Sequence, residues 1–185
     1  DLAMINRMLQ SFAHTPQPVP WRLAVNVSAK TIECAGDEYF NALLRLAPYT
    51  RRLIVESTET YCPDDQRVVA DFAKRVNDAG MYIALDDCSP ENIHWDRNFV
   101  KVVAPRFLKL DGGFLNSCFQ SEDAAPIQAL LDLGRRVNAH IVAEGIDSRH
   151  KREFVADIGV GLLQGWLFSK PVPLPSITPL SACQV

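Results

Sequence analysis

The sequence has 185 residues, of which 48% are hydrophobic and 22% are charged, and its formal net charge is −3. These values are typical of one soluble globular domain and exclude a disordered chain. A slightly acidic chain without a run of Lys or Arg argues against binding duplex nucleic acid, and no stretch of about 18 apolar residues predicts a membrane segment.

The cysteines and histidines are scattered along the chain. The cysteines are odd in number and form no CxxC pair, which argues against a structural zinc site and a disulfide framework. This usage indicates a reducing compartment, so we expect a cytoplasmic protein or the cytoplasmic part of a larger one. These residues are Cys34, Cys62, Cys88, Cys118 and Cys183, with His14, His94, His140 and His150.

The chain starts with a helical pattern over Leu2–Phe12, followed by a proline-rich joint that reaches residue 20. Beyond it, short runs rich in β-branched residues alternate with helical patterns. Most runs are apolar almost to their last residue, as expected for strands buried on both faces of a sheet. The predicted strands are Leu23–Ser28, Leu53–Thr58, Tyr82–Asp87, Phe107–Asp111, His140–Gly145 and, more weakly, Gly161–Phe168.

Three helices are predicted between these strands from apolar periodicity and cap residues. Asp64 or Asp65 caps the first, which ends at Gly80; Asp123 caps the second; and Ser148 caps the third, which ends at a glycine. The alternation predicts a parallel sheet with right-handed crossovers, either open or closed into a barrel. No glycine-rich phosphate turn follows the first strand, and a closed barrel would need residues before residue 1.

Polar side chains stand at the ends of these apolar strands. In a parallel barrel these ends converge on one face, where active sites are built. Clustered carboxylates repel one another unless cations neutralise them, so the pattern predicts a site for two divalent ions that activates water for attack at phosphorus. The alternative for any single acidic residue is a helix cap, for instance at Asp87. The strand-end residues are Asn26, Glu56, Asp86, Asp87, Lys109, Asp111, Glu144 and Gln164.

Short motifs between about Trp21 and Pro171 also carry a family resemblance. In order they read VNVS, ESTET, LDD, LKLD, VAEGID and QGWLFSKP. They resemble the EAL domain of bacterial cyclic-di-GMP phosphodiesterases, whose patterns are NLS, EITES, DDFGTG, KID, EGVE and QGYLFSRP. The resemblance implies an α/β fold, a modified TIM-type (β/α) barrel over residues 21–173, with residues 1–20 as its helix and joint and 174–185 as a tail.

The resemblance also implies roles for individual residues, with Mg²⁺ or Mn²⁺ as the cofactor and Ca²⁺ as an inhibitory alternative. The metal ligands would be Asn26, Glu56, Asp86, Asp87 and Glu144. Three residues would have catalytic roles. Lys109 would orient or deprotonate water, and Gln164 would support that water or a ligand. Glu59 would hold the loop after the Asp pair. Contacts to the nucleotide are expected from Asp111, Asp147 and Lys170, with a solvated lysine as the alternative for Lys170.

Several features depart from the family pattern. The strand with the Glu-Ala-Leu motif is absent, and with it one metal ligand and an arginine that binds phosphate. The loop after Asp87 reads CSPENIHW where the family has FGTGYSSL, so it lacks the glycines that allow a tight bend. We expect the second metal to be held less securely, with a loss of about 10²-fold in rate. We expect His94 to be an exposed loop residue rather than a metal ligand. Asp147 stands where the family has glutamate, which shortens its reach by about 1.5 Å.

Three functions remain open at this stage. The favoured one is a signalling receptor that binds cyclic-di-GMP with weak or no hydrolysis. The first alternative is an active metal-dependent phosphodiesterase that yields pGpG, and the second is a protein-interaction module that binds no nucleotide. Further domains, a partner protein or a homodimer are open as partners.

Overall fold

The computed structural model describes residues 1–172 except 13–18, 59–66, 93 and 95. Within this part, six strands form one sheet whose neighbours follow chain order and pair in parallel. Sequential parallel strands joined by helices are the arrangement of a TIM-like (β/α) barrel, so the predicted fold class is confirmed. The strands are β1 (Val19–Ser28), β2 (Thr50–Thr58), β3 (Tyr82–Cys88), β4 (Phe107–Leu110), β5 (His140–Ala143) and β6 (Leu162–Leu163).

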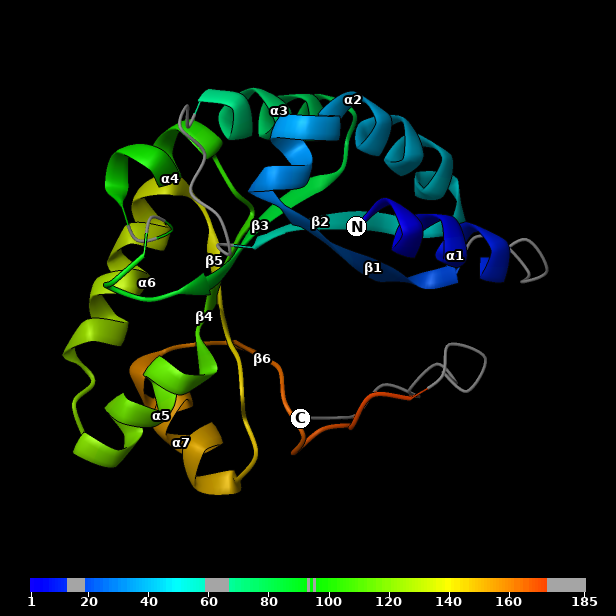
Figure 1. Cartoon of the computed structure of the whole chain (residues 1–185). Helices are drawn as coiled ribbons and strands as arrows, with labels where there is room; N and C mark the ends of the chain where they lie inside the picture. The colour runs from blue at the N-terminus through cyan, green and yellow to red at the C-terminus, as the bar shows by residue number, and fades with distance from the viewer. Residues whose placement is uncertain (13–18, 59–66, 93, 95, 173–185) are drawn as a thin grey trace.

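Most helices lie on the outer side of the curved sheet (Figure 1). No helix in the described ranges is long and apolar enough to cross a membrane. The helices are α1 (Leu2–Phe12), α2 (Ala29–Leu46), the 3-10 turn η1 (Ala47–Tyr49), α3 (Arg67–Asp78), α4 (Arg97–Val103), α5 (Gly112–Ser121), α6 (Ala125–Val137) and α7 (Arg149–Ile158).

The sequence did not predict α2, α4 or α5. The helix α4 has 7 residues and α5 has 10, so an apolar periodicity has few turns in which to appear. The longer α2 is interrupted at Ala35, whose backbone is not helical. In each of these helices the pattern is too short or too broken to separate a helix from a loop.

Side chains along each strand alternate between the two faces of the sheet, as β geometry requires. In β2, Leu53 and Val55 are buried in the hydrophobic core on the helical side. Ile54 and Glu56 instead line a cavity of about 260 Å³ on the inner side. The polar residues at the strand ends continue this inner row, so the alternation directs them to one place.

Two predicted helix ends are confirmed and one predicted start has the expected cap. The Ser148 hydroxyl accepts a hydrogen bond from the Lys151 N–H at the start of α7. Gly80 and Gly159 follow α3 and α7 with φ of +78° and +99°, which glycine adopts without a steric penalty.

The predicted cap of α6 is wrong by one position. The N-cap is Ala124, but the Asp123 carboxylate accepts from the Ala125 N–H at 3.0 Å and so satisfies one of the free N–H groups at the start of the helix. Pro126 in that turn has no N–H to be capped, which removes part of the advantage of a capping side chain. The caps predicted for α3, Asp64 and Asp65, lie outside the described residues, as does the predicted tail.

Candidate functional site

The structure brings the strand-end residues together on the inner rim of the sheet. Asn26 of β1 is in register with Glu56 of β2, and Glu56 with Ala84 of β3. Asp86 follows Ala84 by two residues and therefore faces the same side. Lys109 of β4 is in register with Val142 of β5, and Glu144 follows Val142 by two. The expectation that separate strands contribute to one rim is therefore met by the geometry.

Lys109 lies at the centre of this rim. Its Nζ is 2.8 Å from Asp86 Oδ1, 2.8 Å from Glu144 Oε1 and 3.0 Å from Glu56 Oε2. The lysine is 5% exposed, so these ion pairs are almost shielded from water. One buried ammonium thus joins carboxylates from β2, from β3 and from the residue that follows β5, and holds these strand ends at a fixed separation.

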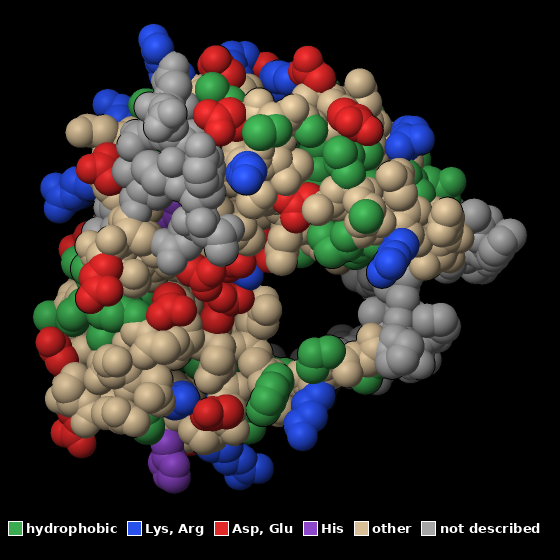
Figure 2. All heavy atoms as spheres, viewed as in Figure 1, with side chains coloured by type: hydrophobic (Ala, Val, Ile, Leu, Met, Phe, Trp, Pro, Cys, Tyr) green, Lys and Arg blue, Asp and Glu red, His purple; other side chains and the backbone are tan. Residues whose placement is uncertain are grey.

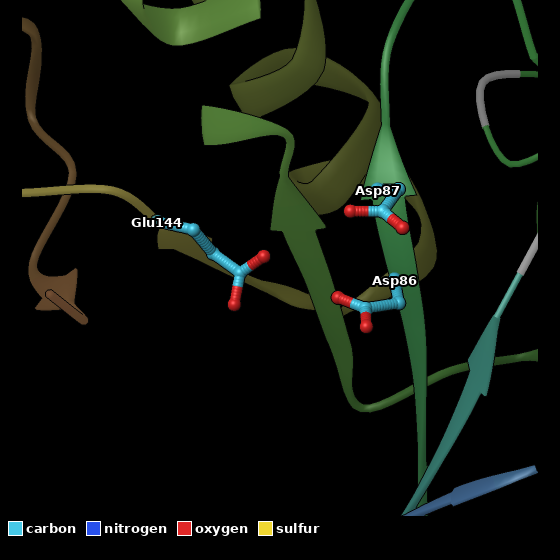
Figure 3. Close-up of side chains that lie close together, drawn as sticks. All are labelled: Asp86, Asp87 and Glu144. Atoms are coloured by element: carbon cyan, nitrogen blue, oxygen red, sulfur yellow. The ribbon is translucent and has the colours of Figure 1, made fainter. Parts of the chain in front are cut away.

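Asp86, Asp87 and Glu144 form a group that can hold a cation. Each offers a carboxylate oxygen, and these oxygens lie within 4.8 Å of one another. Figure 3 shows the carboxylates of the two aspartates on β3 and of Glu144 beyond β5 facing one another across β4. Asp86 Oδ1 is buried and lies 2.8 Å from the Lys109 ammonium. Three carboxylates gathered this closely are a set of hard oxygen donors, which fits Mg²⁺, Mn²⁺ or Ca²⁺.

The electrostatics of the rim favour a bound cation. Burial raises the pKa of Glu56 and of Glu144 above its ordinary value, and Lys109 only partly opposes this. Burial and the neighbouring Asp86 charge also raise the pKa of Asp87. Burial lowers the pKa of Lys109, but hydrogen bonds and charges from the surrounding carboxylates outweigh it and the net pKa is raised. Lys109 is therefore cationic, which suits orienting a water molecule better than deprotonating one.

The acidic side chains gather beside the hollow of the molecule (Figure 2). Next to Glu144 lies a pocket of about 640 Å³, which includes Asp147, Gln164, Trp166 and Lys170. Lys170 Nζ lies 5.5 Å from the centre of the Trp166 ring, and Trp166 is 68% exposed. The pocket therefore combines an exposed aromatic face with a cation directly beside the carboxylate group.

The other predicted site residues have structural partners or lie elsewhere. Asp111 caps α5 by accepting from the Phe114 N–H at 2.6 Å. Asp147 Oδ2 accepts from Lys151 Nζ at 3.0 Å, and this bond lowers the pKa of the Asp147 carboxyl. Glu59 lies outside the described residues. The nucleotide contacts expected from Asp111 and Asp147 and the catalytic role expected for Glu59 stay predictions.

Two glycines allow the pocket to form. Gly145, with φ of +65°, follows Glu144, and a Cβ at this position would lie 3.2 Å from the Cα of Gly112. Gly112 is the first residue of α5. The close backbone approach therefore sets the start of α5 against the end of β5, beside the acidic group.

The expectation of an exposed His94 is wrong. The residue is 3% exposed, and its ring stacks on Phe99 of α4 with 6.0 Å between centroids. Its Nδ1 lies 2.5 Å from the Asp86 carbonyl oxygen, to which it donates. Burial lowers the pKa of His94. His94 is thus covered by Phe99 and held at the end of β3, and the sequence carried no signal for this contact between separate segments.

Asp87 does not cap the next helix. Asp96 does so, by accepting from the N–H groups of Asn98 and Phe99 at 2.9 Å each. Asp87 instead has φ of +50°, and its carbonyl accepts a hydrogen bond from Asn92 Nδ2. The sequence pointed to neither Asn92 nor Lys151 as a partner of site residues.

Comparisons with known proteins agree with this geometry. A family model for the EAL domain matches residues 1–171. The chain is 35% identical over 156 residues to the bifunctional diguanylate cyclase/cyclic di-GMP phosphodiesterase MucR of Pseudomonas aeruginosa. The aligned region covers 83% of this chain and 22% of MucR. The chain is 28% identical over 179 residues to the cyclic di-GMP phosphodiesterase PdeF of Escherichia coli, which covers 94% of this chain and 24% of PdeF. The chain thus spans about a quarter or less of these relatives.

Solved structures lead to the same family. The structure described as "PaMucR Phosphodiesterase, c-di-GMP complex" has a TM-score of 0.74 at 32% identity and covers 94% of this chain and 76% of that chain. The Bacillus subtilis YkuI protein, in complex with c-di-GMP and calcium, has a TM-score of 0.76 at 19% identity over 92% of this chain and 42% of that chain, which shows the fold alone. The strand-end motifs, the barrel-type sheet and the family match together show that the chain belongs to the EAL domain family.

Proposed function

We propose that this chain binds cyclic-di-GMP through a divalent cation at the inner rim and acts as a signalling receptor with little hydrolysis. The observation that carries the proposal is the convergence of Asp86, Asp87 and Glu144, whose carboxylate oxygens lie within 4.8 Å of one another. The names of MucR, PdeF and the MucR complex associate this kind of domain with the same nucleotide.

The rim alone is unsuited to an anionic ligand. Cyclic-di-GMP carries two phosphodiester charges, and the carboxylates around Lys109 would repel them. A cation held by Asp86, Asp87 and Glu144, with Glu56 and Asn26 as further ligands, would offset most of the negative charge of the rim and polarise a phosphate oxygen. The adjacent pocket of about 640 Å³ contains Trp166, on which a base can stack.

The arrangement supports binding more directly than efficient hydrolysis. Two-metal hydrolysis needs two cations about 3.5–4 Å apart. Among the described residues, one group of carboxylates has the spacing that a shared ion needs. The Lys109 ammonium lies between Glu56, Asp86 and Glu144, in the space that a second cation would need. The loop after Asp87 has no glycine, so we also expect it to hold a second cation less securely.

The second candidate is a phosphodiesterase that yields pGpG. It is favoured by the register of Asn26 with Glu56, which places two further oxygen donors beside the carboxylate group. If Lys109 moved aside when ions bind, these donors could hold a second cation.

One experiment separates the two candidates. Cyclic-di-GMP is titrated calorimetrically into the protein with Mg²⁺ or Mn²⁺ and with a chelator, and the mixtures are then chromatographed for pGpG, with MucR assayed in parallel. We expect binding that needs the metal, and pGpG formation about 10²-fold slower than with MucR. The Asp86→Asn variant should lose metal-dependent binding, whereas Asp132→Asn, whose exposed partner is Arg135 on α6, should not. Absence of heat at micromolar nucleotide refutes the binding proposal, and rapid pGpG formation supports the enzyme.

The same proposal includes the cellular location of the domain and its partners. The described cysteines Cys34, Cys88 and Cys118 form no disulfide with one another, which fits a reducing, cytoplasmic location. Further domains of the protein would receive the signal. Association as a homodimer stays a prediction.

A further inference from the structure

The backbone turns sharply at the carboxylate pair, in a loop that has no glycine. Asp87 has φ of +50°, a conformation that costs a non-glycine residue energy and needs support from its surroundings. Residues 88–95 read CSPENIHW, so no residue in the loop has the conformational freedom of glycine. Something else must hold the two aspartates in place.

Two side chains of this loop bind the backbone of the aspartate pair. His94 Nδ1 donates to the Asp86 carbonyl at 2.5 Å, and Asn92 Nδ2 donates to the Asp87 carbonyl. The two side chains are also linked, because Asn92 Oδ1 accepts from the His94 N–H at 3.0 Å. Each aspartate of the pair therefore has its own donor from the loop.

His94 is itself held by the protein interior. It is 3% exposed and stacks on Phe99, with ring planes 10° apart. Phe99 belongs to α4, so the ring contact joins His94 to that helix. The donor to Asp86 is thus fixed to α4 and not to a free loop.

We propose that Asn92 and His94 are positioning residues, which set the Asp86 and Asp87 carboxylates at the cation site by holding the backbone carbonyls of both residues. Their hydrogen bonds stabilise a sharp backbone turn that glycine residues would otherwise allow. The inference rests on the proposed function, since it concerns how the cation site of that function is held. A ligand shell is sensitive to displacements of about 0.5 Å, so loss of either donor disturbs the site without removing a ligand.

The test uses variants that separate the hydrogen bond from packing. His94→Phe keeps an aromatic ring against Phe99 and loses the donor. His94→Asn keeps a donor close to the position of Nδ1 and loses the ring. Asn92→Leu removes the second donor at similar volume. Asp96→Ala is the matched control, because it weakens the same loop at its α4 end without touching either aspartate carbonyl.

Mn²⁺ affinity of the purified protein is measured by electron paramagnetic resonance, with unfolding temperature recorded for each variant. We expect His94→Phe and Asn92→Leu to bind Mn²⁺ about 10-fold more weakly, as for other residues that orient metal ligands. His94→Asn should recover part of the loss, and Asp96→Ala should bind as the wild type although it is less stable. Wild-type affinity in His94→Phe, or a loss in Asp96→Ala equal to that in His94→Phe, overturns the inference.

A second measurement needs no metal, so it separates failure of the positioning role from failure of the proposed function. The ¹³C carboxyl signals of Asp86 and Asp87 are recorded in the metal-free protein. We expect these signals to shift or broaden in His94→Phe and Asn92→Leu but not in Asp96→Ala. If the wild type binds no Mn²⁺, the proposed function fails; unchanged carboxyl signals in both loop variants refute the positioning role in either case.

Discussion

Replacing Lys109 by methionine tests the electrostatic account of the rim. The lysine is 5% exposed and pairs with Glu56, Asp86 and Glu144 at 2.8–3.0 Å. Methionine keeps much of the side-chain volume but leaves these carboxylates, which are mostly shielded from water, without a cation. Breaking a buried ion pair by removal of one partner costs about 3–5 kcal/mol. We therefore expect the free energy of unfolding of Lys109→Met, without metal, to fall by about that amount.

The assay is urea unfolding followed by circular dichroism, in chelator and in Mg²⁺. At a slope of about 2 kcal/mol/M, the loss lowers the urea midpoint by about 1.5–2.5 M. Mg²⁺ at a hundred times its dissociation constant adds about 2.7 kcal/mol to any protein that binds it only when folded. Because Mg²⁺ takes over the charge of the missing ammonium, it should stabilise Lys109→Met more than the wild type.

Lys151→Met is the control for this prediction. Lys151 is also buried, but its partner Asp147 is exposed, so its loss leaves no carboxylate shielded from water. Its effect should be clearly smaller and independent of Mg²⁺. The reasoning is refuted if Lys109→Met unfolds at the wild-type midpoint in chelator, or if Mg²⁺ stabilises both proteins equally.

Three further outcomes follow from the site. The pKa of Glu56, Glu144 and Asp87 is raised on folding, so the folded state holds more protons than the unfolded state. These groups should therefore make the metal-free protein less stable as pH rises above about 4.5, measured as a falling urea midpoint. Added Mg²⁺ should remove this fall of the midpoint with pH. Gly145→Ala should cost roughly 1–3 kcal/mol in the same assay, since φ is +65° and the new Cβ meets Gly112; a midpoint equal to that of the wild type would contradict the close approach. Trp166→Ala should weaken cyclic-di-GMP binding by roughly 5–150-fold in calorimetry, from about 1–3 kcal/mol of base stacking, and should leave the unfolding midpoint unchanged because the residue is 68% exposed; unaltered affinity would exclude Trp166 as a stacking surface.

The strands and the rim were predictable because they depend on local pattern. An apolar run such as Tyr82–Asp87 identifies a strand buried on both faces, and the polar residue at its end faces the rim because side chains alternate. Parallel strand ends meet at one face in any barrel, so the meeting of Asn26, Glu56 and Glu144 needed no knowledge of distances.

Other features depended on contacts between segments far apart in the chain. The pattern of CSPENIHW cannot show that His94 is buried, because its burial comes from Phe99 and the end of β3. Local chemistry thus determined which residues the rim contains, whereas long-range packing determined how Lys109 joins its carboxylates and how the loop holds the aspartate pair, because those energies exist only once distant segments are in contact.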